Sequence, residues 1–296
     1  MKPRVLLLGG SGFIGSALAP KLAAEGWEIA IGGRGADLKA SLEGCTAVVH
    51  LACCTHPGSS RLHPLMEREN LECSLDLMEA LQSRPDTHLV FLSSGGALYG
   101  NPRTNPVAED TAAEPLSFHA AGKAAVEAFI TAHRAAAHPA TILRIANAYG
   151  PGQALTQGFG FIRTLLEHAR SGQPLEVWGD GETVRDFVFI DDVTEAIARA
   201  LARPETSGTW NIGSGVGHSL NQAITLAREI TRQSIPINYR AARQSDVRGV
   251  VLDISRARLK LGWAPKIALE EGLQKSWEWR LNAEFDAAGL IHRDRA

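Results

Sequence analysis

The stretch "RVLLLGGSGFIG", residues 4–15, decides the fold of this chain. Its first half is a short apolar run of the kind that forms a buried strand, and it leads directly into glycines. Glycines at this spacing let the loop turn sharply, approach a pyrophosphate with its backbone and pack the next helix on the strand. That helix would present free N–H groups and a positive dipole end to phosphates. The alternative to a dinucleotide loop is a plain tight turn. The predicted contacts are Gly9, Gly12, Phe13, Ile14 and Gly15.

Downstream of this loop, apolar strands alternate with helical patterns. The strands are "WEIAI", "CTAVVHLAC", "THLVFLSSGG" and "ATILRIANAYG", and the helices include "LECSLDLMEALQSR" and "AGKAAVEAFITAHRAAA". This alternation predicts an α/β, doubly wound (Rossmann-type) parallel sheet with helices on both faces. We expect residues 1–152 to form the dinucleotide-binding domain. Residues 153–296 are expected to form mainly a smaller substrate-binding lobe, with about 182–215 returning to the first domain through "GTWNIGSG".

Composition excludes several classes of function. The chain has 296 residues, 45% of them hydrophobic, and a formal net charge of −2, with its basic residues scattered. It therefore has no basic field for nucleic acid or an acidic membrane, and no segment reads as a membrane span. The four cysteines lack metal-ligand spacing, so we expect no metal, no disulfide and a reducing cytoplasm. Adjacent Cys53 and Cys54 are interpreted as buried small residues, and His50 as a core or cofactor-lining residue.

The end of the second predicted strand bears on the choice of cofactor. An acidic residue there would bind the ribose 2′-OH of NAD, whereas an Arg would accommodate the 2′-phosphate of NADP. The sequence has Gly33 followed by Arg34, which slightly favours NADP over NAD. The alternative is that Arg34 lies over the adenine or is a solvated loop residue.

Seven motifs then occur in an order typical of one family. They are "GGSGFIG", "AVVHLA" (47–52), Asn70, "SSGGALYG" (93–100), "LRIANAYGPGQ" (143–153), "WGDGETVRDFVFIDDV" (178–193) and "ARQSDV" (242–247). Together they resemble the extended short-chain dehydrogenase/reductases of the NAD-dependent epimerase/dehydratase group, which includes UDP-glucose 4-epimerase. The resemblance covers nearly the whole chain.

The resemblance implies hydride transfer at C4 of a nucleotide-diphosphate sugar through a 4-keto intermediate, most simply in a 4-epimerase. The keto sugar can be reduced on its other face, lose water or be released. The resemblance also implies a homodimer formed through two helices that flank the site. It places a base four residues before Lys123, which binds the cofactor ribose, and a hydroxyl near Ser94. Further cofactor contacts implied are Asp37, Leu38, Leu51, Ala52 and Asn70, and substrate contacts are Ser94, Gly95, Asn147, Arg185, Arg243 and Asp246.

The chain departs from the family pattern in three places. The family's catalytic Tyr is replaced by His119, so that the motif reads HxxxK, and Gly95 takes the place of a Ser or Thr. The segment between the second strand and "AVVHLA" lacks a strand and a helix. A neutral imidazole can accept a proton near pH 7, and Lys123 would lower its pKa further. An imidazole is shorter than a phenol, so either the sugar sits deeper, for which we expect Gly95 to make room, or a water molecule bridges the gap.

These departures leave two functions open. The first is an enzyme in which His119, Lys123 and Ser94 are catalytic. The second is a catalytically silent relative that binds a dinucleotide or a nucleotide sugar. Tyr99 is interpreted as structural or substrate-lining rather than as a substitute base.

Overall fold

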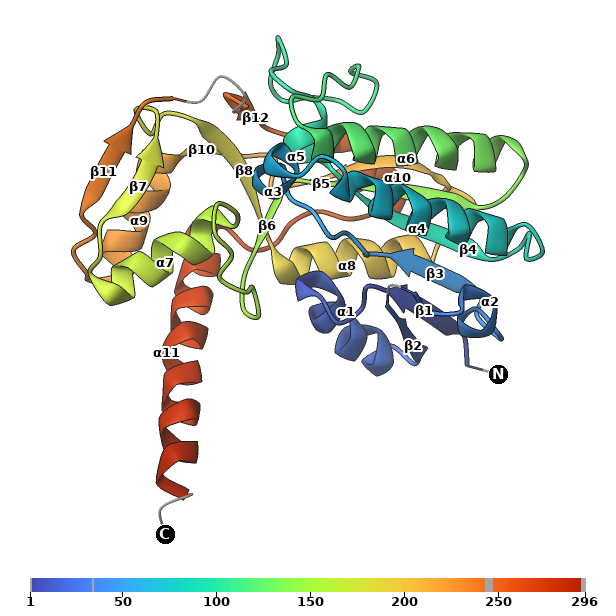
Figure 1. Ribbon diagram of the computed structural model, residues 1–296, viewed down its shortest axis with the longest axis horizontal. Helices are drawn as coiled ribbons and strands as arrows, with labels where there is room; N and C mark the ends of the chain where they lie inside the picture. Colours follow the sequence, from blue (N-terminus) through green and yellow to red (C-terminus); the bar gives the residue numbers. More distant parts are fainter. Residues whose placement is uncertain (1, 34, 243–246, 294–296) are drawn as a thin grey trace.

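A computed structural model describes residues 2–33, 35–242 and 247–293 of the chain (Figure 1). Its main element is a six-stranded sheet with the order β2-β1-β3-β4-β5-β9, in which every pairing is parallel. The strands are β1 (Arg4–Leu8), β2 (Glu28–Gly32), β3 (Ala47–His50), β4 (His88–Ser94), β5 (Ala140–Ile145) and β9 (Gly208–Ile212). The predicted α/β class is confirmed, and "GTWNIGSG" supplies the strand that pairs with β5.

Both faces of this sheet are buried, which explains why its strands are apolar throughout rather than alternating. Val5 and Leu7 of β1 pack into one hydrophobic core, whereas Leu6 and Leu8 pack into another on the opposite face. The first core is closed by α1 (Phe13–Ala24), α8 (Ile190–Leu201) and α10 (Ser255–Leu261). The second is closed by α2 (Leu38–Ser41), α4 (Met66–Leu81) and α6 (Phe118–Ala135).

One edge of the sheet is shorter than the family pattern would require. Strand β2 has β1 as its neighbour, and no strand of the described residues lies beyond it. Between β2 and β3, the described residues form one helix, the four-residue α2. The prediction that this segment lacks the further strand is therefore confirmed among the described residues, whereas one short helix, α2, is present.

A second group of elements surrounds a separate core (Figure 1, left). Its small sheets contain β6 (Asn147–Tyr149), β8 (Val184–Phe189), β10 (Gly217–Ser219) and β12 (Gly249–Val250), and β7 (Leu175–Trp178) with β11 (Ile237–Arg240). Its helices are α7 (Phe161–Ser171), α9 (Leu220–Thr231) and α11 (Leu269–Arg293). Short helices α3 (Pro57–Leu62), α5 (Gly95–Leu98) and η1 (Pro204–Thr206) lie in connections of the larger sheet. Within the described ranges, no helix combines the length and apolarity needed to cross a bilayer.

Candidate active site

The glycine loop joins β1 to α1 with almost no side chains. Gly9 has φ +87°, and a Cβ there would lie 2.6 Å from the backbone nitrogen of Ala52. A Cβ on Gly15 would lie 2.4 Å from the carbonyl oxygen of Gly10, so α1 packs directly on the loop. Gly12 caps α1 without a side chain, and the first turn holds no acidic residue. The N–H groups and positive end of α1 therefore remain for an anion, which fits the pyrophosphate of a dinucleotide.

The remaining residues expected around this loop contribute through their backbone. The side chains of Phe13 and Ile14 pack against the hydrophobic cores, which leaves their N–H groups at the start of α1. Leu51 donates its backbone N–H to the carbonyl of Leu8 at 2.9 Å, which holds the loop after β3 beside the glycines. Ala52 is in that loop and faces Gly9. The structure thus brings together predicted cofactor residues from two strands.

The end of β2 offers less for the adenosine half. Gly33 is exposed, and Arg34 lies outside the described residues. The carboxylate of Asp37 accepts hydrogen bonds from the backbone of Lys39 and Ala40, at 3.0 and 3.2 Å, and so caps α2. Leu38 packs against the core below α2. Asp37 is therefore occupied locally, and its contact with a cofactor remains a prediction.

His119 and Lys123 lie one turn apart on α6, as the HxxxK spacing predicts. Lys123 Nζ donates to the carbonyl of Leu92 in β4 at 2.8 Å and lies 4.6 Å from the centre of the Phe91 ring. His119 is only 8% exposed, and its Nδ1 lies 3.1 Å from the hydroxyl of Thr55. Burial, followed by the charge of Lys123, lowers the pKa of His119 to about 4. The ring is therefore neutral at pH 7, but it is a weak base.

A small cavity lies beside Lys123, and Cys53, which also lines it, has its Sγ 4.0 Å from His119 Nδ1. Its volume is about 10 Å³, which suits one water molecule. Lys123 and Glu67 line it from α6 and α4, and Ala52 and Cys53 line it from the loop after β3. Because Ala52 also faces Gly9, Lys123 and the glycine loop both lie next to the loop that follows β3.

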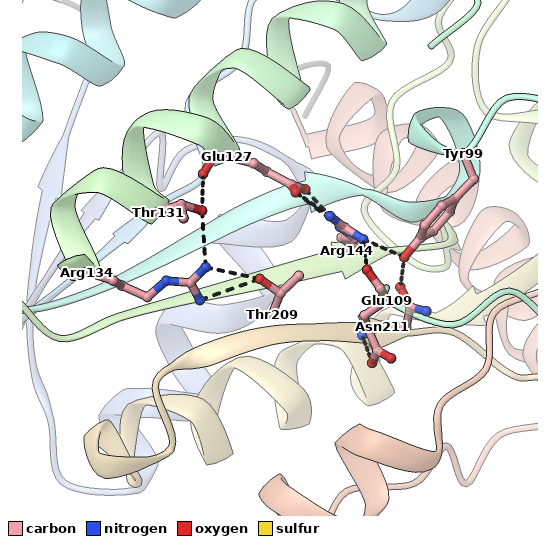
Figure 2. Close-up of polar contacts among 8 residues, drawn as sticks. All are labelled: Tyr99, Glu109, Glu127, Thr131, Arg134, Arg144, Thr209 and Asn211. Atoms are coloured by element: carbon pink, nitrogen blue, oxygen red, sulfur yellow. Dashed lines mark hydrogen bonds and ion pairs between the residues drawn. The ribbon is translucent and has the colours of Figure 1, made fainter. Parts of the chain in front are cut away.

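The three tyrosines of the chain have hydroxyl partners other than Lys123. Tyr99 is buried, donates to Asn211 Oδ1 at 2.7 Å and accepts from Arg144 Nη1 at 2.8 Å (Figure 2). Burial raises its pKa. Tyr149 is buried in the second core. Tyr239 lies on β11, and its hydroxyl donates a hydrogen bond to Asn221 Oδ1. These contacts fit the structural one of the two roles predicted for Tyr99, and His119 occupies the position of the base.

The geometry corrects the expectation for Gly95. A Cβ at this position would lie 2.6 Å from Leu252 Cδ1 and 3.0 Å from the carbonyl of Arg144. The position faces the buried Leu252 and cannot make room for a sugar, so that prediction is wrong. Ser94 ends β4 and is half-buried, and its hydroxyl has no hydrogen-bond partner among the described residues. Its predicted role as a hydroxyl donor to substrate remains open to test.

In the second lobe, two of the four predicted diphosphate-binding residues lie within the described part of the chain. Asn147 Nδ2 donates to the carbonyl of Asp186 at 3.0 Å, which ties β6 to β8. Arg185 Nη1 donates to the carbonyl of Val247 at 2.8 Å. Arg243 and Asp246 lie outside the described residues.

Sequence reasoning missed two of the residues around His119, Glu67 and Thr55. Asn70 Nδ2 donates to Glu67 Oε2 and to Thr55 Oγ1, each at 2.9 Å, so Asn70 organises this region and its direct contact with a cofactor remains a prediction. The spacing of Glu67 and Asn70 places them on one face of α4, which was an available signal. No local signal marks Thr55. Cys53 is exposed, with Sγ 4.0 Å from His119 Nδ1, so its interpretation as a buried residue is wrong.

His50 behaves as a core residue. It is 1% exposed, and its Nε2 lies 2.9 Å from the hydroxyl of Ser74. Because that hydroxyl donates to the carbonyl of Asn70, His50 donates to Ser74. Across the described ranges, no group of three or more His, Cys, Asp or Glu side chains is arranged to hold a metal ion.

Comparisons with known proteins agree with this geometry. Residues 5–213 match the model of the NAD dependent epimerase/dehydratase family. The chain is 31% identical to a UDP-glucose 4-epimerase of Mycolicibacterium smegmatis, over 94% of this chain and 99% of that protein. Its fold matches the UDP-glucose 4-epimerase of Thermotoga maritima, solved with UDP-glucose, with a TM-score of 0.89, 31% identity and coverage of 95% and 99%. The enzyme of Thermus thermophilus, solved with NAD, gives a TM-score of 0.86 at 30% identity, with coverage of 94% and 99%. This chain therefore belongs to the NAD-dependent epimerase/dehydratase family.

Proposed function

We propose that this protein epimerises a nucleotide-diphosphate sugar at C4, with UDP-glucose and UDP-galactose as the first candidates. The similarity to UDP-glucose 4-epimerases extends over nearly the whole chain. The observation that carries the proposal is the position of His119 and Lys123. They lie on one face of α6. Lys123 lines a cavity together with Cys53, which is next to His119, and with Ala52, which faces Gly9 of the glycine loop.

The chain's residues divide the work as follows. The glycine loop and the N-terminus of α1 bind the cofactor pyrophosphate, and the Lys123 ammonium binds its ribose hydroxyls. The bound nicotinamide supplies the acceptor and donor of a hydride. His119 faces the oxygen on the reacting sugar carbon, and Ser94 donates a hydrogen bond to the same oxygen. Asn147, Arg185, Arg243 and Asp246 bind the nucleotide diphosphate.

For the cofactor we propose NAD. The family is NAD-dependent, and a related structure contains NAD. The slight preference for NADP predicted from Arg34 has no support from these relatives. Parallel titrations with NAD and NADP test the choice, and tighter binding of NADP that disappears in Arg34→Ala would restore the preference for NADP.

One observation favours the alternative of a silent binding protein. A general base works best with a pKa near the working pH, and the pKa of His119 is about 4. Under this alternative the chain would still bind a dinucleotide and a nucleotide sugar, because the glycine loop and Lys123 are retained.

The experiment is incubation of the protein with UDP-, dTDP- and GDP-sugars and NAD, followed by proton NMR of the sugar. Formation of the C4 epimer supports the proposal. His119→Gln should then abolish turnover and preserve binding, while His168→Gln on α7 serves as a matched control with full activity. If every sugar is recovered unchanged although its lines broaden, the silent alternative replaces the enzyme.

The assembly and compartment are part of the proposal. Helices α4 and α6 expose Leu75 and Phe129, whose exposed fractions are 44% and 39%, on adjacent helices. We propose a homodimer that buries both in a four-helix contact. Light scattering should show a dimer that Phe129→Glu dissociates and Leu259→Glu, on α10, leaves intact. We propose a reducing cytoplasm as the compartment, because none of the four cysteines is in a disulfide.

A further inference from the structure

Four side chains form a continuous chain of hydrogen bonds that ends on His119. Asn70 Nδ2 donates to Glu67 Oε2 at 2.9 Å and to Thr55 Oγ1 at 2.9 Å. The Thr55 hydroxyl lies 3.1 Å from His119 Nδ1. Glu67, Thr55 and His119 are each 8% exposed, so water competes little for these bonds.

The direction of each bond follows from a backbone contact. The N–H of Cys54 can only donate, and it reaches Asn70 Oδ1 at 2.9 Å. The amide nitrogen of Asn70 therefore faces Thr55, whose hydroxyl accepts from it and has one hydrogen left to give. Within the described chain, two atoms are close enough to Thr55 Oγ1 to accept this hydrogen: His119 Nδ1 at 3.1 Å and Cys53 Sγ at 3.7 Å. Sulfur is the weaker acceptor, so Thr55 donates to the ring.

An imidazole nitrogen that accepts a hydrogen bond carries no hydrogen of its own. We propose that Thr55, oriented by Asn70 and Glu67, holds the neutral ring of His119 in the tautomer with its hydrogen on Nε2. Nε2 has no hydrogen-bond partner within the part of the chain that the structure describes, so this N–H is left for a ligand. The ionisable groups around the ring are Cys53, His56, Glu67 and Lys123.

This tautomer changes the chemistry expected of His119. The ring donates from Nε2 and cannot take a proton there. A neutral N–H donor suits a carbonyl oxygen, such as that of a 4-keto sugar, on which negative charge develops during reduction. Removal of a hydroxyl proton at Nε2 requires the ring hydrogen on Nδ1 and the Thr55 hydroxyl turned toward Cys53. The sugar's position rests on the proposed function, whereas the tautomer does not.

The test is an NMR measurement on the whole protein with ¹⁵N-labelled histidine. Long-range proton–nitrogen correlations distinguish protonated from bare ring nitrogens, and His119→Gln identifies the signals of His119 by their loss. We expect a bare Nδ1 and a protonated Nε2 at pH 7. A protonated Nδ1 in the unaltered protein overturns the proposal, and no variant of Thr55 is needed for that conclusion.

Variants of Thr55 test its role as a positioning residue. Thr55→Val removes the hydroxyl and should give a mixture of tautomers, whereas Thr55→Ser should restore the original pattern. Thr141→Val is the matched control, because Thr141 bonds a different ring, that of His88 at 3.0 Å, and its loss should leave His119 unchanged. Signals of His119 that are identical in Thr55→Val refute the proposal.

Kinetics provide a second readout if the protein turns over a sugar. Thr55→Val should lower kcat about tenfold or more with little change in KM, and Thr55→Ser should recover most of it. If the protein turns over no sugar but shows the Nε2–H tautomer, the proposed function fails and this inference still holds.

Discussion

Replacement of Glu127 by Ala tests the buried ion pair that joins α6 to β5. The Glu127 carboxylate accepts from Arg144 Nη2 at 2.7 Å and from Nε at 3.1 Å, and the side chains are 9% and 11% exposed (Figure 2). Arg144 also donates to Tyr99 and to the carbonyl of Glu109, so it cannot turn toward solvent without breaking those bonds. Loss of the carboxylate leaves a buried guanidinium without its counter-charge.

The expected cost is about 3–5 kcal/mol of unfolding free energy, the usual penalty for removing one partner of a buried pair. Ala is a good helix former, so helix propensity does not account for this loss. With a urea m-value of about 3 kcal/mol/M, the unfolding midpoint should fall by roughly 1–1.7 M. Urea titrations followed by tryptophan fluorescence and by far-UV circular dichroism measure this shift.

The exposed pair Arg68–Glu72 provides the matched control, since it also lies on a helix and its side chains are 77% and 53% exposed. Glu72→Ala should cost less than about 0.5 kcal/mol. The double variant Glu127→Leu with Arg144→Met should lose much less than the two single changes together, because no unpaired charge remains. Equal and small losses for Glu127→Ala and Glu72→Ala would refute the reasoning.

Three further outcomes are expected. Gly15→Ala places a Cβ 2.4 Å from the Gly10 carbonyl oxygen, so it should destabilise the fold by about 1–3 kcal/mol and weaken NAD binding in calorimetry; unchanged affinity would contradict the packing of α1 on the loop. Tyr99→Phe should cost about 1–3 kcal/mol through the bonds lost to Asn211 and Arg144, with turnover nearly unchanged; a large fall in turnover would return Tyr99 to the site. Burial lowers the pKa of His50 to about 3 and those of His88 and His119 to about 4. Because these folded-state values lie below the unfolded value of about 6.5, the unfolded chain binds more protons and stability should fall from pH 6.5 toward pH 4. At pH 5 the loss of unfolding free energy is about 2 kcal/mol for a fully buried ring. In urea titrations at pH 7 and pH 5, His88→Gln should therefore lose less unfolding free energy between the two pH values than the unaltered protein. An equal loss in both proteins would contradict the lowered pKa of His88.

Local patterns were sufficient for the fold class and for the outline of the site. The glycine spacing after β1 depends on backbone conformation within a few residues, and the apolar strands need only be buried on both faces. The segment between β2 and β3 has too few residues for another strand and helix. The absence of a described strand beyond β2 was therefore also predictable. The HxxxK spacing places two side chains on one face of any helix.

Only the tertiary structure decided what those side chains touch. Gly95 faces Leu252, and Thr55 meets His119, across 64 positions of the chain. The partners of Arg144 likewise come from separate segments of the chain. Hydrophobic periodicity and turn chemistry act between near neighbours, whereas the direction and protonation of a buried polar side chain depend on which distant segments pack against it. The sequence by itself therefore determined the sheet, the glycine loop and the HxxxK pair, and packing determined which nitrogen of His119 faces the ligand site in our proposal.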